Sequence, residues 1–366
     1  MCDHRLANGP VAVLEMILKR LIAPAVVLTA LLVPLAVCAK QPPIIDRDQF
    51  FGEIQISGAQ ISPDGKFLSF LKPFKGTRNI WVKKVTEPFS KARPISGEAT
   101  RPVRDYFWSR DAKYVLYSQD TAGDENFNVY AIDPGKAADP KTRLPPTRAL
   151  TDLKGVKTEI FAVPKSKPDV LYIGLNDRDA RWHDLYELRI STGEKTLIRQ
   201  NTDQIFRWEF DHDGNLRLAE RTNQVGDTEV LRVDPDGFKL TYSCTVLEEC
   251  HVLGFDAQNK QVFLLTNKGS LNLTELDTMD PAEGTTSKIE SDPEHHVDIS
   301  GGEISEIDYH ILYTKYEDDR VRLYFRDKNF EAGYHWLQTK LPGKEIGFGA
   351  RSRDENLAPR AALSGD

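Results

Sequence analysis

The feature that most constrains the fold is a polar turn flanked by short apolar runs, which recurs along the chain. QISPDGKFLSFL, FWSRDAKYVLYS and EFDHDGNLRLAE are three copies of it. Aspartate and glycine suit such turns because they tolerate the backbone geometry and bond their own main chain. The copies recur every 44 to 58 residues, a period typical of β-propellers. The turns are centred on or near Asp64, Asp111, Asp169, Asp213, Gln258, Tyr309 and Asp354.

Each repeat has a second strand-like segment with alternating apolar and polar residues, such as NVYAIDP (128–134) and EVLRVDPDG (229–237). No useful helical periodicity follows residue 60, and the only weak helical window spans 47–53, so a parallel α/β sheet is excluded. We therefore predict an all-β chain: a β-propeller with six full blades and a partial seventh, preceded by an N-terminal signal helix. The last repeat ends in AALSGD, so we expect an incomplete last blade and a truncated chain.

The first 39 residues predict an N-terminal extension and a secretory signal peptide. Lys19 and Arg20 precede the apolar run LIAPAVVLTALLVPLAV, and small residues lead to cleavage after Ala39. The domain division is therefore 1–39 for the leader and 40–366 for the propeller. The expected location is exported and periplasmic. Two alternatives would attach the chain to a membrane: an uncleaved anchor, or a lipid on Cys38.

Cysteine usage agrees with export, because only Cys244 and Cys250 follow the leader. In an oxidising compartment this pair can close a short hairpin loop, and the alternative is two separate buried thiols. His295 and His296 lie in a stretch that predicts a solvated loop, so we expect neither a metal nor a cofactor. The net charge is −7 and no segment concentrates lysine and arginine, so we expect no nucleic-acid partner.

Several segments, in order, resemble one known family. They are ISPDGKFLSFL, YSQDTAGDENFNVYAIDP (117–134), RALTDLKGVKTEI (148–160) and GLNDRDARWHDLYELRISTGE (174–194). The chain from about residue 45 to 366 is similar to the N-terminal propeller of the prolyl oligopeptidase family of serine peptidases, in its acylaminoacyl-peptidase-like and dipeptidyl-aminopeptidase-like bacterial branch. The matching residues are Asp120, Gly123, Asp124, Glu125, Asn126, Tyr130, Asn176, Arg178, Asp179, His183, Asp184 and Tyr186.

The resemblance implies a propeller followed by an α/β-hydrolase domain that carries the Ser-Asp-His triad. That serine lies in a G-x-S-x-G turn, and no serine of this chain has glycine at both positions. We therefore assign no catalytic residue and expect the chain to be inactive by itself. In the intact enzyme the propeller would gate the access of short peptides to the hydrolase domain, which is the expected partner. The alternative is a stand-alone periplasmic propeller that acts as a protein-binding scaffold.

Two charged clusters are the candidate site, each with two interpretations. Asp124, Glu125 and Asn126 could hold the amino terminus of a peptide, or they could cap a loop. The second cluster could face a cavity between domains, or it could form a polar network that joins adjacent blades, which we favour. It consists of Arg178, Asp179, His183 and Asp184.

Overall fold

The computed structural model describes residues 44–47, 55–269, 271–356 and 360–364, of which 360–364 are described by their backbone alone. The sheets lie in one compact unit, residues 54–366. The predicted leader and most of the helical window at 47–53 lie outside the described residues. No helix in the described part is long and apolar enough to span a membrane.

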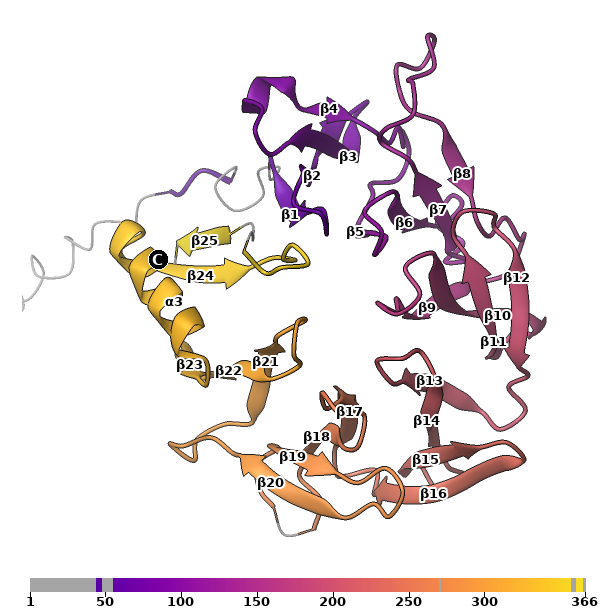
Figure 1. Cartoon of the computed structure of the whole chain (residues 1–366), viewed down its shortest axis with the longest axis vertical. Helices are drawn as coiled ribbons and strands as arrows, with labels where there is room; N and C mark the ends of the chain where they lie inside the picture. The colour runs from indigo at the N-terminus through magenta and orange to yellow at the C-terminus, as the bar shows by residue number, and fades with distance from the viewer. Residues whose placement is uncertain (1–43, 48–54, 270, 357–359, 365–366) are drawn as a thin grey trace, which may run out of the picture. The chain divides into compact units, whose positions relative to one another are not determined.

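Within this unit, antiparallel sheets follow one another along the chain, and each sheet pairs its strands in sequence order (Figure 1). The first strand of each sheet lies nearest the centre of the ring. The all-β propeller predicted with six full blades and a partial seventh is confirmed as a six-blade propeller; its sixth blade has three strands instead of four, and a two-stranded sheet follows it.

The first three sheets contain four strands each. Sheet 1 is β1 (Ser57–Ile61), β2 (Phe67–Phe74), β3 (Thr77–Lys84) and β4 (Arg93–Pro94), and sheet 2 is β5 (Tyr106–Trp108), β6 (Val115–Gln119), β7 (Asn128–Ile132) and β8 (Thr147–Ala149). Sheet 3 is β9 (Thr158–Ala162), β10 (Val170–Asp179), β11 (Trp182–Arg189) and β12 (Lys195–Arg199).

Sheets 4 and 5 also have four strands. Sheet 4 is β13 (Ile205–Phe210), β14 (Leu216–Thr222), β15 (Thr228–Asp234) and β16 (Gly237–Cys244), and sheet 5 is β17 (Cys250–Phe255), β18 (Val262–Thr266), β19 (Glu275–Met279) and β20 (Thr286–Glu290). Sheet 6 is β21 (Ile299–Ile304), β22 (Ile311–Glu317) and β23 (Val321–Phe325), and a two-stranded sheet, β24 (Lys344–Phe348) and β25 (Arg360–Ser364), follows.

The core is divided into separate clusters, each between two consecutive sheets. Leu71 of sheet 1 packs with Val115 of sheet 2, and Tyr172 of sheet 3 packs with Trp208 of sheet 4. Sheet 3 is covered by sheet 2 on one face and by sheet 4 on the other. Its strand β10 is therefore buried over six consecutive residues. The simple alternation expected of a strand with one wet face is lost there.

The predicted turns share one hydrogen-bond pattern in two sheets. Ser62 Oγ donates to Asp64 Oδ1 (2.7 Å) and accepts from the amide of Phe67 (2.9 Å). Ser109 Oγ likewise donates to Asp111 Oδ1 (2.5 Å) and accepts from the amide of Tyr114 (2.9 Å). In sheets 1 and 2, the side chains of this serine and aspartate thus hold the turn between the first two strands.

The expectation that no helix follows residue 60 is wrong. Helix α3 (Lys328–Lys340) stands after β23, and its N-cap Asp327 accepts a hydrogen bond from the amide of Phe330 (2.7 Å). Phe330 also packs on Phe348 of β24, with ring centroids 4.8 Å apart. The one-turn 3₁₀ helix Phe89–Lys91 is a minor departure from an all-β fold, and the 13-residue helix α3 is a larger one.

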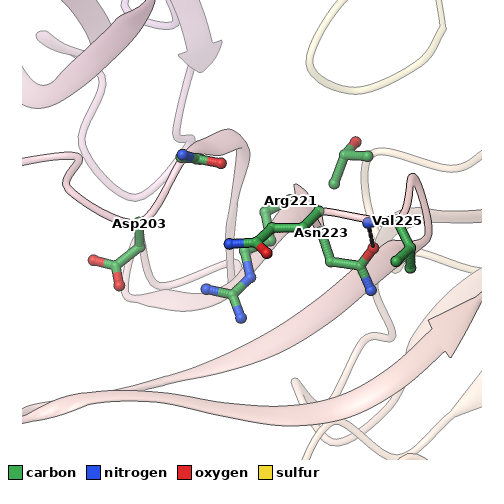
Figure 2. Close-up of a pocket in the computed structure, with 7 residues that line it drawn as sticks. Asp203, Arg221, Asn223 and Val225 are labelled. Atoms are coloured by element: carbon green, nitrogen blue, oxygen red, sulfur yellow. Dashed lines mark hydrogen bonds between the residues drawn. The ribbon is translucent and has the colours of Figure 1, made fainter.

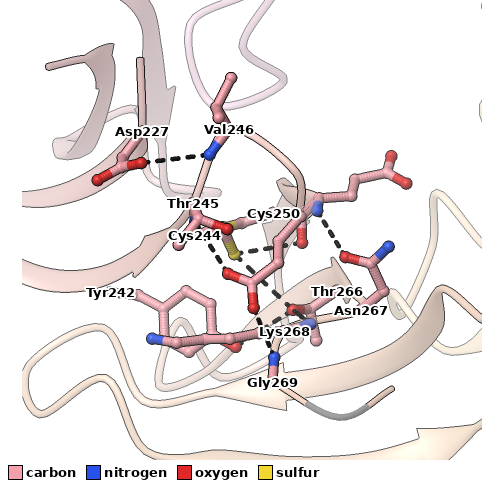
Figure 3. The surroundings of a disulfide bond; sticks show 12 residues. Asp227, Tyr242, Cys244, Thr245, Val246, Cys250, Thr266, Asn267, Lys268 and Gly269 are labelled. Atoms are coloured by element: carbon pink, nitrogen blue, oxygen red, sulfur yellow. Dashed lines mark hydrogen bonds between the residues drawn. A yellow bond between two sulfur atoms is a disulfide. The ribbon is translucent and has the colours of Figure 1, made fainter. Parts of the chain in front are cut away.

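A disulfide joins Cys244, the last residue of β16, to Cys250, the first residue of β17 (Figure 3). It closes the short segment that links sheets 4 and 5. The amide of Val246 within this segment donates to Asp227 Oδ1 of sheet 4 (3.2 Å). The cross-link therefore fixes how the chain passes from one blade to the next.

Replacing both cysteines with serine (C244S/C250S) should lower the free energy of unfolding by about 2 kcal/mol, the entropic value for so short a closed loop. Urea denaturation with and without dithiothreitol measures this loss. The reductant should lower the stability of the native protein and leave the double variant unchanged. A reductant effect of equal size on both proteins would contradict the assignment.

Candidate functional site

The propeller has two faces that carry different turns, because the chain reverses direction at every turn of its antiparallel sheets. One edge carries the turn between the first and second strand of each sheet, and we call it the first-turn face. The other carries the turn between the second and third strands and the segments that join the sheets, and we call it the connector face. Both predicted charged clusters lie on the connector face, in sheets 2 and 3.

Asp124, Glu125 and Asn126 lie in the segment that joins β6 to β7. Asp124 Oδ1 accepts hydrogen bonds from the amides of Thr121 and Asn126, each 3.1 Å long. A hydrogen bond from the Asn126 side chain contributes most to holding the pKa of Asp124 below its usual value. The carboxylate of Glu125 is exposed and makes no hydrogen bond or ion pair within the described residues. Asp124 therefore has the geometry of a loop cap.

Arg178 and Asp184 form a two-point ion pair across the β10–β11 hairpin. Arg178 Nε and Nη2 each donate to one oxygen of Asp184, at 2.7 Å. Asp184 Oδ1 also accepts from the amide of Asn201, in the segment leading to sheet 4 (2.7 Å). Burial acts to raise the pKa of Asp184, but the hydrogen bonds from Arg178 and Asn201 outweigh it and keep that pKa low. This network ties sheet 3 to its connector.

The other two predicted residues of the second cluster lie close by but have different surroundings. Asp179 pairs with the exposed Arg181, whose hydrogen bonds lower the pKa of Asp179 to about 2. His183 is mostly buried, its Nδ1 lies 3.7 Å from Glu159 Oε2, and burial lowers its pKa. No hydrogen bond or ion pair of the described residues joins this cluster to Asp124. A role of either cluster in gating peptides stays a prediction.

The same face carries arginine–carboxylate pairs that sequence analysis did not identify as pairs, although Asp120 is one of the residues that carry the family resemblance. Arg101 Nη2 lies 3.2 Å from Asp120 Oδ2, and the two nitrogens of Arg322 lie 2.8 and 3.0 Å from the carboxylate of Asp292. The arginine fork holds the pKa of Asp292 far below its usual value. The partners are 19 and 30 residues apart in sequence, so no local pattern could have predicted them.

On the first-turn face, charged side chains from distant sheets meet. Arg110 of sheet 2 lies 2.9 Å from Glu306 of sheet 6, and Lys165 of sheet 3 lies 3.4 Å from the same carboxylate. Arg353, between β24 and β25, donates from Nη2 to the carbonyl of Arg110 (2.6 Å) and from its amide to the carbonyl of Pro63 in sheet 1 (2.8 Å). These contacts join the beginning of the ring to its end.

A cavity of about 300 Å³ lies beside this cluster. The imidazole of His212 stacks on Tyr309, with ring centroids 3.4 Å apart, and the ammonium of Lys165 lies 4.8 Å from the Tyr309 ring centre. The walls come from the inner strands and turns of sheets 2 to 6. A space of this size can take a single extended peptide segment but no folded domain.

Sheet 4 carries a buried carboxyl pair that sequence analysis missed. Burial raises the pKa of Glu209 to about 7, and burial together with the charge of Glu209 raises that of Glu220 to about 7. Arg207 lies 3.4 Å from Glu209, and Glu220 Oε1 is buried without a hydrogen-bond partner in the described residues. His251 of sheet 5 has its pKa lowered by burial and by Arg207. The pair therefore titrates near neutrality.

The connector face also holds two cavities. One, of about 750 Å³, lies at sheet 2 and is bordered by Arg101, Asp120 and the stacked rings of Tyr117 and Tyr130. The other, of about 380 Å³, lies at the β14–β15 turn and includes Arg221 (Figure 2). In the described part of the chain, no group of three or more histidine, cysteine and acidic side chains could hold a metal ion.

Replacing Asp184 with asparagine (D184N) should lower the free energy of unfolding by about 2 kcal/mol, because Arg178 loses its buried partner. Replacing Asp179 with asparagine (D179N) is the matched control, since its pair with Arg181 is exposed, and it should cost much less. Urea denaturation at pH 7 measures both. Equal losses would contradict the buried network.

Folding stability should fall as the pH rises from 5 to 7.5. Glu220 keeps its proton in the folded state up to a pKa of about 7 and loses it near pH 4.5 when unfolded, so stability is lost in that interval. Glu220→Gln (E220Q) should remove up to about 3 kcal/mol of this dependence. Denaturation at half-unit pH steps measures it, with the exposed Glu194→Gln as control. An unchanged pH profile in E220Q would refute the buried assignment.

Comparison with known proteins shows similarity to two curated peptidases. No protein-family model matches it. Dipeptidyl aminopeptidase BIII of Pseudoxanthomonas mexicana is 32% identical over 263 residues, which are 70% of this chain and 36% of that protein. Dipeptidyl peptidase family member 6 of Caenorhabditis elegans is 27% identical over 242 residues, 62% of this chain and 32% of that protein. The chain thus spans about a third of each of these curated relatives.

Among solved structures, oligopeptidase B from Trypanosoma brucei matches with a TM-score of 0.45 and 14% identity, over 64% of this chain and 34% of that one. The sequence relatives agree with the resemblance carried by residues 117–134 and 174–194, and the sheets have the order of a propeller. The chain therefore belongs to the prolyl oligopeptidase family and is a β-propeller of that family.

Proposed function

We propose that this chain is the non-catalytic propeller of an exported serine peptidase and that it screens the short peptides that reach the hydrolase domain. The similarity to dipeptidyl aminopeptidase BIII supports a peptidase context. Because the chain spans only 36% of that relative, the catalytic step is assigned to a hydrolase domain outside this sequence, as in the family the chain resembles.

The observation that carries the screening role is the crossing of the ring by side chains on the first-turn face. Glu306 binds two cations from the opposite side, Arg110 and Lys165. The adjoining cavity has a volume of about 300 Å³, which is room for a short extended peptide segment. A folded protein would have to break these ion pairs to pass, whereas a short peptide could lie beside them.

Export is the second part of the proposal. The Cys244–Cys250 disulfide supports it, since such bonds persist mainly in oxidising compartments such as the periplasm. The leader predicted for residues 1–39 would supply the signal. Membrane attachment through that leader, by an uncleaved anchor or a lipid on Cys38, would tether the propeller without changing the screening role.

The purified chain should bind unfolded peptides of four to eight residues and leave them intact. Fluorescence anisotropy with labelled peptides measures binding, and chromatography of the same mixtures after a day measures cleavage. A folded protein that contains the same peptide sequence inside its core is the matched control, and it should not bind.

Three results would decide between the alternatives. Turnover of the peptides by this chain would overturn the non-catalytic role. Tight binding of folded proteins with no binding of short peptides would favour a scaffold. If the peptide bound equally well when it was fused to a folded protein, the screening role would be contradicted.

A further inference from the structure

The cavity at the β14–β15 turn lies on the connector face, between that turn and the segment that leads from sheet 3 to sheet 4 (Figure 2). Its walls combine a cation, an anion, carboxamides and an apolar side chain, a mixture suited to a peptide and not to a purely apolar ligand. They are formed by Asp203, Gln204, Arg221, Thr222, Asn223, Gln224 and Val225.

The guanidinium of Arg221 is the best-placed ligand group in this cavity. Its Nε donates to Glu229 Oε2 (2.8 Å), and the Asn223 side chain lies 3.3 Å from the other oxygen of that carboxylate. Its two terminal nitrogens make no hydrogen bond or ion pair with any described residue. Figure 2 shows the Arg221 side chain extending toward the side of the cavity where Asp203 lies. Arg221 is thus oriented by its neighbours while its terminal donors stay available.

The turn beside Arg221 is held by its own hydrogen bonds. Asn223 Oδ1 accepts from the amides of Val225 and Asp227, each 3.0 Å long. Val225 is 76% exposed, and Val246 of the disulfide-closed segment lies over the adjacent Gly226. An exposed apolar side chain therefore lines the same cavity, across Asn223 from the guanidinium, on a turn held by its own hydrogen bonds.

The remaining charge in the cavity limits what can bind. Asp203 is not ion-paired with Arg221, and its Oδ2 accepts a hydrogen bond from Thr202 Oγ1 (2.9 Å). A ligand with one carboxylate can use the arginine fork, but a second carboxylate would meet Asp203 and be repelled. Val225, on the other side of the cavity, favours an aliphatic group elsewhere on the same ligand.

We propose that the cavity formed by Arg221, Asp203 and Val225 binds the C-terminal carboxylate of a short peptide that carries an aliphatic side chain within its last residues. This inference rests on the proposed peptide-screening function and adds a recognition site to it. The carboxylate takes both terminal nitrogens of Arg221, and the aliphatic side chain covers Val225. The carboxamides of Gln204 and Gln224 can satisfy the peptide main chain. Peptides that end in aspartate or glutamate are disfavoured by Asp203.

The test uses the full chain and a fluorescein-labelled pentapeptide of alanines ending in leucine, either as the free acid or as the C-terminal amide. The acid should bind at least tenfold more tightly than the amide. Arg221→Gln (R221Q) should abolish this difference by weakening the acid alone, and Arg221→Lys should restore part of it. Arg181→Gln is the matched control, because Arg181 is exposed on the same face and, among the described residues, pairs only with Asp179.

Equal affinities for acid and amide in the native chain would overturn this site while leaving the proposed screening function intact. Equal weakening of both peptides by R221Q would show a structural effect and would also overturn it. No binding of either peptide would refute the site and the proposed function together. Thermal unfolding of each variant verifies that the fold is retained.

Discussion

The fold depends on covering both faces of every sheet. A blade of this propeller is apolar on each side, as the clusters between consecutive sheets show, so no blade is stable without its neighbours. The first and last sheets of the ring must therefore meet. The hydrogen bond from the Arg353 amide to the Pro63 carbonyl, and the ion pair of Arg110 with Glu306, make that closure polar and specific.

The repeat could be predicted because its signals are local. A serine and an aspartate two residues apart, as at Ser62 and Asp64, specify a turn by bonding their own backbone. Helix α3 could not be predicted in this way, since its sequence carries Gly333 and a mixture of aromatic and polar residues with weak amphipathicity. Its position is set by tertiary contacts, such as Phe330 on Phe348, which the sequence does not encode locally.

The residues of the candidate site likewise differ in whether their partners are close in the sequence. Asp124 and its loop were identifiable because their partners lie within three residues. The partner of Arg178 was also in the predicted cluster, six residues away. Arg221 was missed, because its importance comes from a cavity built by two segments that the ring brings together. A buried carboxyl pair such as Glu209 and Glu220 is equally invisible in sequence, where it looks like the exposed side of a strand.

The interface between sheets 4 and 5, called the seam below, combines two features with opposite effects on stability. The buried Glu209 and Glu220 make it costly to keep the seam closed once they ionise, since charge is then held away from water. The Cys244–Cys250 disulfide restrains the chain at the connector end of the same seam. The cavity with Arg221 lies on the connector face of sheet 4, beside this segment, so the covalent link helps to hold the geometry of the proposed peptide site.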